Sequence, residues 1–154
     1  MDDIKLREAD YNDLEEMKGL LLGVIKNFCK SDYNEKQTEA WASTAKNKKR
    51  WESMLKNQYV VIAEINSKIV GFGSLHKGNY IDFMYVHKDF LRRGIASKIF
   101  ESLQNKSSEL GFTKLTSDVS KTARPFFETK GFSIIKENNN LINDVEIINY
   151  HMSQ

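Results

Sequence analysis

Cysteine and proline each occur only once in this 154-residue chain, as Cys29 and Pro125. A single cysteine excludes an internal disulfide framework and argues against a cysteine-based zinc site, so we expect no bound metal. Glycine is also sparse, with 8 residues, and no stretch rich in proline, glycine or serine divides the chain. We therefore expect a single domain that spans residues 1–154 and buries one hydrophobic core.

A large excess of one charge is missing as well, since the chain has 23 basic and 21 acidic residues and a net charge of +2. This balance gives no reason to expect a nucleic acid or a membrane as a partner. No apolar run approaches the roughly 18 residues that a membrane span needs. The acidic start Met1-Asp2-Asp3 lacks the apolar segment of a secretory signal. We expect a cytoplasmic protein.

The first third of the chain predicts one strand and two helices. Residues 4–8 alternate apolar and polar side chains, as in a half-buried strand. Apolar residues then recur at steps of three and four from Leu14 to Phe28. This stripe predicts a helix that begins near Asn12 or Asp13, either of which could cap it. A second helical stretch covers residues 35–55, with a break in its middle.

The remaining chain alternates between strands and helices. Short β-branched or alternating runs predict strands at 59–65, 69–75, 81–86, 114–119, 132–136 and 145–152, the last two joined by an asparagine-rich turn. Two helices are predicted, one from Arg93 to Leu110 that ends at Gly111 and one over residues 122–130. The order predicts an α/β (α+β) fold, with a mixed, mostly antiparallel sheet, helices on both faces and a central β-α-β crossover.

A basic turn between a strand and a helix carries the clearest chemical signal. It contains Arg92 and Arg93, followed by Gly94 and Ala96 at the start of the helix. Backbone N–H groups at such a turn, together with the positive end of a helix, form a concave anion site. Gly94 permits the tight turn, and the arginines add donors for phosphate. We predict a diphosphate site at residues 92–97; the alternative is an ordinary helix start with two surface arginines.

This stretch resembles the acetyl-CoA-binding motif of the GCN5-related N-acetyltransferase (GNAT) family, Gln/Arg-x-x-Gly-x-Gly/Ala. The match runs to Ala96, with Leu91 where the family has Gln or Arg. Residues 120–132 are similar to a second family motif, Asn-x-x-Ala-x-x-x-Tyr-Glu-x-x-Gly-Phe. Ser120 takes the position of the Asn and Phe127 that of the Tyr.

The resemblance covers nearly the whole chain. Within the family, residues 37–41, Trp51 and the ending 149–152 resemble a small bacterial subgroup of uncharacterised acetyltransferases. The family implies acetyl-CoA (coenzyme A) as the co-substrate. Dimerisation is common in the family, and the sequence leaves a homodimer open.

The family also implies where the coenzyme lies. Its pantetheine arm would enter between two splayed strands, residues 83–86 and 115–119, and a backbone N–H near Met84 or Tyr85 would stabilise the oxyanion. The implied cofactor-binding residues are Met84, Tyr85, Val86, Leu91, Arg92, Arg93, Gly94, Ile95, Ala96, Ser97, Ser120, Phe127 and Lys130.

The expected reaction is direct transfer of the acetyl group to a primary amine of a small molecule. One alternative is acetylation of a protein lysine or N-terminus. Another is a non-catalytic sensor of acyl-CoA, for which Phe127 is the argument because it lacks the family's hydroxyl. The absence of Gly-x-x-x-x-Gly-Lys-Ser/Thr and Gly-x-Gly-x-x-Gly argues against other nucleotide-binding domains.

Proton transfer has several candidate residues. Asp82 and His76 could accept the proton of the amine, although an exposed carboxylate and a surface histidine are the plain alternatives. Tyr85, Ser120 or Tyr150 could replace the hydroxyl that Phe127 lacks. The predicted catalytic residues are Asp82, Tyr85 and Ser120.

Aromatic side chains of the first helices and of the tail are candidates for the acceptor pocket, and a place in the core is their alternative. They are Phe28, Tyr33, Trp41, Trp51 and Tyr150. The sequence shows no acidic cluster that would mark a polyamine or aminoglycoside site.

Overall fold

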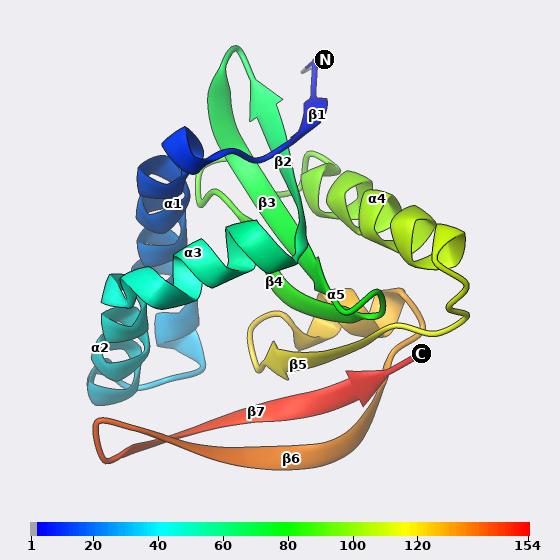
Figure 1. The fold of residues 1–154 in the computed structure, drawn as a ribbon. Coiled ribbons are helices and arrows are strands. Elements are labelled where there is room, and N and C mark those ends of the chain that lie inside the picture. Colours follow the sequence, from blue (N-terminus) through cyan, green and yellow to red (C-terminus); the bar gives the residue numbers. More distant parts are fainter. Residues whose placement is uncertain (1–2) are drawn as a thin grey trace.

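The apolar runs of the sequence form a seven-stranded sheet in the computed structural model, which describes residues 3–154. Met1 and Asp2 of the acidic start lie outside the described residues. The strands lie in the spatial order β1-β2-β3-β4-β5-β7-β6 (Figure 1). They are β1 (Lys5–Glu8), β2 (Tyr59–Ile65), β3 (Lys68–His76), β4 (Tyr80–Val86), β5 (Thr116–Ser120), β6 (Ser133–Ile142) and β7 (Val145–Ser153).

Helices cover both faces of this sheet, as predicted (Figure 1). The α-helices are α1 (Leu14–Asn27), α2 (Glu35–Ser43), α3 (Lys48–Asn57), α4 (Ile95–Glu109) and α5 (Arg124–Thr129). Short 3-10 turns are η1 (Tyr11–Asp13), η2 (Cys29–Ser31) and η3 (Thr44–Lys46). Every strand pair is antiparallel except β4 with β5, which α4 connects as the predicted crossover. The α/β fold class is confirmed.

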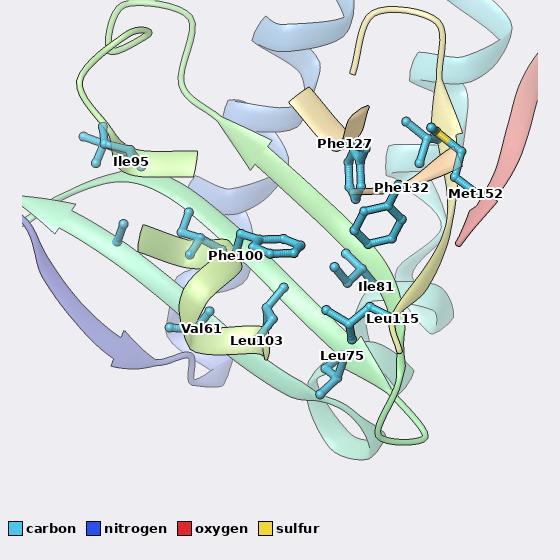
Figure 2. Close-up of a cluster of buried hydrophobic side chains, with 14 of the residues drawn as sticks. Val61, Leu75, Ile81, Ile95, Phe100, Leu103, Leu115, Phe127, Phe132 and Met152 are labelled. Atoms are coloured by element: carbon cyan, nitrogen blue, oxygen red, sulfur yellow. The ribbon is translucent and has the colours of Figure 1, made fainter. Parts of the chain in front are cut away.

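The core is divided by the sheet into two clusters. On one face α4 packs Ile95, Ile99, Phe100 and Leu103 against the strands and against Phe127 of α5 (Figure 2). On the other face α1 and α3 cover a second cluster that contains Trp51 and Phe72. α4 lies close to β3: a Cβ atom added at Gly73 would lie only 2.7 Å from the side chain of Ile99. Glycine at this position lets the start of α4 approach the centre of the sheet.

The cap before α1 differs from the prediction. Asp10 is the capping residue: its carboxylate accepts a hydrogen bond from the backbone N–H of Asn12 at 2.8 Å. Asp13 accepts from the backbone N–H of Asp10 at 2.8 Å and from Arg7 at 2.7 Å and 2.8 Å. A side-chain cap by Asn12 or Asp13 was the wrong expectation, because Asp13 is occupied by Asp10 and Arg7.

Two details of the second half of the chain also differ from the prediction. Gly111 follows α4 with a φ of +92°, as expected for a helix stop, but Leu110 is 54% exposed rather than part of the apolar face. The asparagine-rich segment lies inside β6 and is not a turn. Asn138 and Asn140 donate to the side-chain oxygen of Asn149 across the hairpin, at 2.9 Å and 3.1 Å, and these bonds hold the segment extended.

Candidate active site

β4 and β5 form a fork. They pair at only two positions, Tyr80 with Thr116 and Ile81 with Ser117, and then diverge. The hydroxyl of Ser117 donates to the carbonyl of Ile81 at 2.7 Å and closes the fork at its base. The splayed strands expected from the family resemblance are therefore present.

The free edge of β4 faces the opening of the fork. The backbone N–H of His87 bonds to Val70 of β3, and that of Phe83 bonds to the side chain of Ser74. Hydrogen-bonding direction alternates along an antiparallel strand, so Met84 and Val86 direct their N–H and C=O groups away from β3. Asp82 is the additional residue of a β-bulge in this strand. A ligand in the fork could thus pair with Met84 and Val86 like a further strand.

The turn before α4 has the geometry of an anion site. Arg92 and Gly94 have φ values of 62° and 78°, and no side chain caps the helix at Gly94. The first intrahelical bond runs from Lys98 to Gly94. The N–H groups of residues 95–97 therefore lack an acceptor within the helix. A Cβ at Gly94 would meet nothing within 4 Å, so the turn borders open space. This ring of donors fits a diphosphate group.

A cavity of about 440 Å³ joins this turn to the fork. Among its lining residues are eleven of the predicted cofactor-binding residues: Met84, Tyr85, Val86, Leu91, Arg92, Gly94, Ile95, Ala96, Ser97, Ser120 and Phe127. Arg93 and Lys130 are outside this lining. The guanidinium of Arg93 lies 4.9 Å from the ring centre of Phe90, and the ammonium of Lys130 lies 5.6 Å from that of Phe100.

A second cavity, of about 560 Å³, lies between the fork, α2 and the β6–β7 hairpin. It shares one wall with the first, which consists of Trp41, Met84, Tyr85, Ser120, Ala123 and Phe127. We call the first the coenzyme cavity and the second the acceptor cavity. A separate polar hollow of about 570 Å³ between β1 and α4 contains none of the predicted site residues.

Comparisons with known proteins agree with this geometry. A family model described as an acetyltransferase (GNAT) domain matches residues 29–153. The chain belongs to the GNAT family. It is 33% identical over 137 residues to the uncharacterized N-acetyltransferase YafP of Escherichia coli, an alignment that covers 89% of this chain and 86% of that protein. This membership places it among the acetyl-CoA-dependent acyltransferases.

Solved GNAT structures have the same fold. A GCN5-related N-acetyltransferase from Rhodopseudomonas palustris has a TM-score of 0.94 and 30% identity, covering 100% of this chain and 96% of that one. The PaiA N-acetyltransferase from Thermoplasma acidophilum, solved in complex with coenzyme A, has a TM-score of 0.80 and 16% identity. That alignment covers 99% of this chain and 98% of the other.

The family's tyrosine position is occupied by Phe127, which is 3% exposed and packs edge-on against Phe132 (Figure 2). Two hydroxyls in the shared wall lie nearby. Ser120 accepts a hydrogen bond from the N–H of Ala123 at 3.0 Å, which leaves its own proton free to donate. The hydroxyl of Tyr85 forms no hydrogen bond with residues 3–154, and burial raises its pKa. Tyr85 therefore stays protonated at neutral pH.

Asp82 borders the acceptor cavity and is tightly held. Arg50 donates to its two oxygens at 2.7 Å and 2.8 Å, and Gln58 donates at 2.7 Å. Its side chain is 12% exposed rather than at an open edge. Burial alone would raise the pKa of Asp82, but the bonds from Arg50 and Gln58 outweigh it, so the pKa is lowered. His76 lines neither cavity.

Asp118 also lines the acceptor cavity, and sequence reasoning missed it. It lies on β5 directly after the last paired residue, as Asp82 does on β4. Its carboxylate accepts from Tyr80 at 2.6 Å and from Asn138 at 2.8 Å, and it lies 3.0 Å from Nδ1 of His151. These bonds lower the pKa of Asp118 against the opposing effect of burial. Two carboxylates 36 residues apart, Asp82 and Asp118, thus line one cavity. The sequence signal that could have identified Asp118 was an acidic residue on each of the two strands expected to form the fork.

The aromatic candidates divide between pocket and core. Tyr33 and Trp41 line the acceptor cavity, whereas Phe28 lines the coenzyme cavity. Trp51 is 1% exposed and donates its indole N–H to Ala45, so it belongs to the core. Tyr150 lies under the guanidinium of Arg124 and lines neither cavity. The acceptor cavity is therefore lined mainly by β4, β5 and the β6–β7 hairpin.

Residues 3–154 contain neither a candidate metal site nor a candidate membrane span. No group of three or more His, Cys, Asp or Glu residues is arranged to hold a metal ion. No helix in this part of the chain has the length and apolar character to cross a membrane.

Proposed function

We propose that this GNAT protein transfers the acetyl group of acetyl-CoA directly to a primary amine of a small molecule. The shared wall of the two cavities is the observation that carries the proposal. Residues of both motifs meet there, with Tyr85 from β4 and Ser120 and Phe127 from the second motif. The two cavities adjoin at these residues. Acetyl-CoA in one cavity and an amine in the other would meet there, and the acetyl group would pass directly without a covalent intermediate on the protein.

The coenzyme cavity suits the diphosphate and pantetheine parts of coenzyme A. The N–H groups of residues 95–97, together with Arg92, would hold the diphosphate. The open edge of β4 would bind the pantetheine amides through Met84 and Val86. The thioester supplies an activated acetyl group, and the backbone N–H of Met84 would stabilise negative charge on its oxygen. The alternative donor, the N–H of Tyr85, points toward β3 and away from the fork. Arg93 and Lys130 would act only at the rim of this site.

Proton transfer is assigned to groups around the shared wall. Asp82 is ionised and so can accept the proton of the reacting nitrogen, directly or through water. Its lowered pKa makes it a weak base, which suffices because the nitrogen becomes more acidic as the new bond forms. Tyr85 or Ser120 would donate to the departing thiolate in place of the missing Phe127 hydroxyl. Cys29 takes no part, because burial raises the pKa of its thiol to about 11.

The shape of the acceptor cavity favours a small molecule over a protein substrate. Its volume of about 560 Å³ lies within the usual range for small-ligand sites. Gln37 of α2 donates to the backbone of Glu146 at 2.9 Å, and Tyr33 donates to Ile148 at 2.6 Å. These bonds attach the β6–β7 hairpin to the helices and so close one side of the cavity. A polypeptide would need that side open.

The test has two stages. Calorimetry should show binding of acetyl-CoA and no comparable binding of ATP or NAD. A thiol-release assay over a panel of primary amines should then show turnover, with acetylation of the amine confirmed by mass spectrometry. Release of thiol only with peptide substrates would favour the protein-acetylating alternative. Binding of acetyl-CoA without turnover of any amine would favour the sensor alternative.

A further inference from the structure

Asp118 is the carboxylate of the acceptor cavity that no arginine or lysine neutralises within residues 3–154. Asp82 forms a two-pronged ion pair with Arg50, so this pair carries no net charge. The neutral hydroxyl of Tyr80 donates to Oδ2 of Asp118, and the neutral amide of Asn138 donates to Oδ1. Nδ1 of His151 lies 3.0 Å from the same Oδ1. The Asp118 side chain remains 34% exposed while it lines the cavity.

The position of Asp118 relative to the shared wall gives a spacing. Asp118 and Ser120 are two residues apart on β5. A strand advances about 3.3 Å per residue, so their Cα atoms are separated by roughly 7 Å along the strand. Ser120 belongs to the shared wall, where we place the reacting nitrogen, whereas Asp118 lines only the acceptor cavity.

An ammonium group bound to Asp118 would be a poor nucleophile. A nearby carboxylate favours the charged form of an amine and raises its pKa, whereas attack on the thioester needs the neutral form. The group that suits Asp118 is therefore a second cation that does not react. Tyr80 positions the carboxylate through its bond of 2.6 Å, and its ring lines the same cavity.

From this arrangement we propose that Asp118 is a specificity-determining residue that binds a second, non-reacting ammonium group of the acceptor. The preferred acceptor is then a diamine with its two nitrogens about 7 Å apart. This inference rests on the proposed function and narrows its substrate class. A charge-assisted hydrogen bond to a bound ligand commonly changes discrimination by about 10- to 100-fold.

The test compares three probes of similar length: 1,5-diaminopentane, 5-amino-1-pentanol and pentylamine. For the wild-type protein we expect kcat/KM to be about 10- to 100-fold higher for the diamine than for pentylamine, with the alcohol near pentylamine. A hydroxyl forms a hydrogen bond without charge, so this series separates charge from hydrogen bonding. Because it uses the unmodified protein, it does not depend on any variant being folded.

The variant Asp118→Asn should bring the preference for the diamine close to one. Its matched control is Glu137→Gln, which removes one exposed carboxylate from β6, the outer strand of the hairpin, without touching the cavity. The control should keep the wild-type preference. Thermal unfolding of both variants checks that they are folded.

Two results would overturn the inference: no preference for the diamine in the wild type, or an unchanged preference in Asp118→Asn. Either leaves the proposed function standing, because amines would still be acetylated. Absence of turnover with every amine, despite binding of acetyl-CoA, would instead refute the proposed function.

Discussion

The hydroxyl of Ser117 donates a 2.7 Å hydrogen bond to the carbonyl of Ile81 at the last pair before β4 and β5 diverge. This bond adds to the strand pairing at the base of the fork, and both side chains are buried. The next residue on each strand is an aspartate of the acceptor cavity, Asp82 or Asp118. The geometry of the site therefore depends on where this pairing stops.

Removal of the Ser117 hydroxyl should destabilise the protein. Ser117→Ala leaves a buried carbonyl without this donor, which should lower the free energy of unfolding by about 1–2 kcal/mol in urea denaturation. Ser107→Ala is the matched control, because Ser107 is equally buried and its hydroxyl has no partner among residues 3–154. The control should be neutral or slightly stabilising. Equal losses in the two variants would contradict this role of Ser117.

A carboxylate at the start of α4 should weaken binding of coenzyme A. Gly94→Asp places a negative charge beside the proposed diphosphate site, and we expect about a tenfold or greater rise in Kd, measured by calorimetry. Gly111→Asp is the control at the other end of the same helix. Gly111 also has a positive φ and open space at its Cβ position, so backbone strain and added charge are matched. Similar affinity losses in both variants would refute the assignment of the site.

The Arg7–Asp13 pair should make stability depend on pH in acid. The hydrogen bond from Arg7 lowers the pKa of Asp13, and the effect exceeds the opposing one of burial. An unfolded aspartate titrates near 3.9, so the pair contributes its full stabilisation above that pH, and the contribution is lost as pH falls through the lower folded-state value. Asp13→Asn keeps an oxygen for the backbone N–H of Asp10 but removes the charge.

Measured at pH 7, Asp13→Asn should lower the free energy of unfolding by about 1 kcal/mol, since Arg7 is partly exposed and solvent screens the pair. The difference from the wild type should shrink as the pH is lowered below about 4. Glu15→Gln is the control, because the carboxylate of Glu15 is 89% exposed and pairs only with Lys18 among residues 3–154. A difference that stays constant down to the lowest pH at which the protein folds would contradict the ionic role of Asp13.

Most of the fold could be predicted because its signals are local. The apolar stripe of α1, the short runs of β2 to β4 and the stop at Gly111 each identify an element from a few adjacent residues. The turn at Arg92 and Gly94 was predictable for the same reason. The place of Asp118 in the cavity was not predictable, because it depends on the distances from Asp118 to Asp82 and to β6. Only the folded sheet determines these distances. Trp51 was ambiguous because aromatic residues suit a core and a pocket equally.

The missing family tyrosine leads to a rescue experiment. If Tyr85 donates the proton to the leaving thiolate, Tyr85→Phe should lower kcat by about tenfold, a modest effect because a thiolate leaves with little assistance. Its KM for acetyl-CoA should change little. Phe127→Tyr in the Tyr85→Phe background should recover activity, since position 127 also lines both cavities. Tyr11→Phe, at a 60% exposed tyrosine, is the control and should match the wild type. A normal kcat in Tyr85→Phe, combined with a loss in Ser120→Ala, would assign the proton to Ser120 instead.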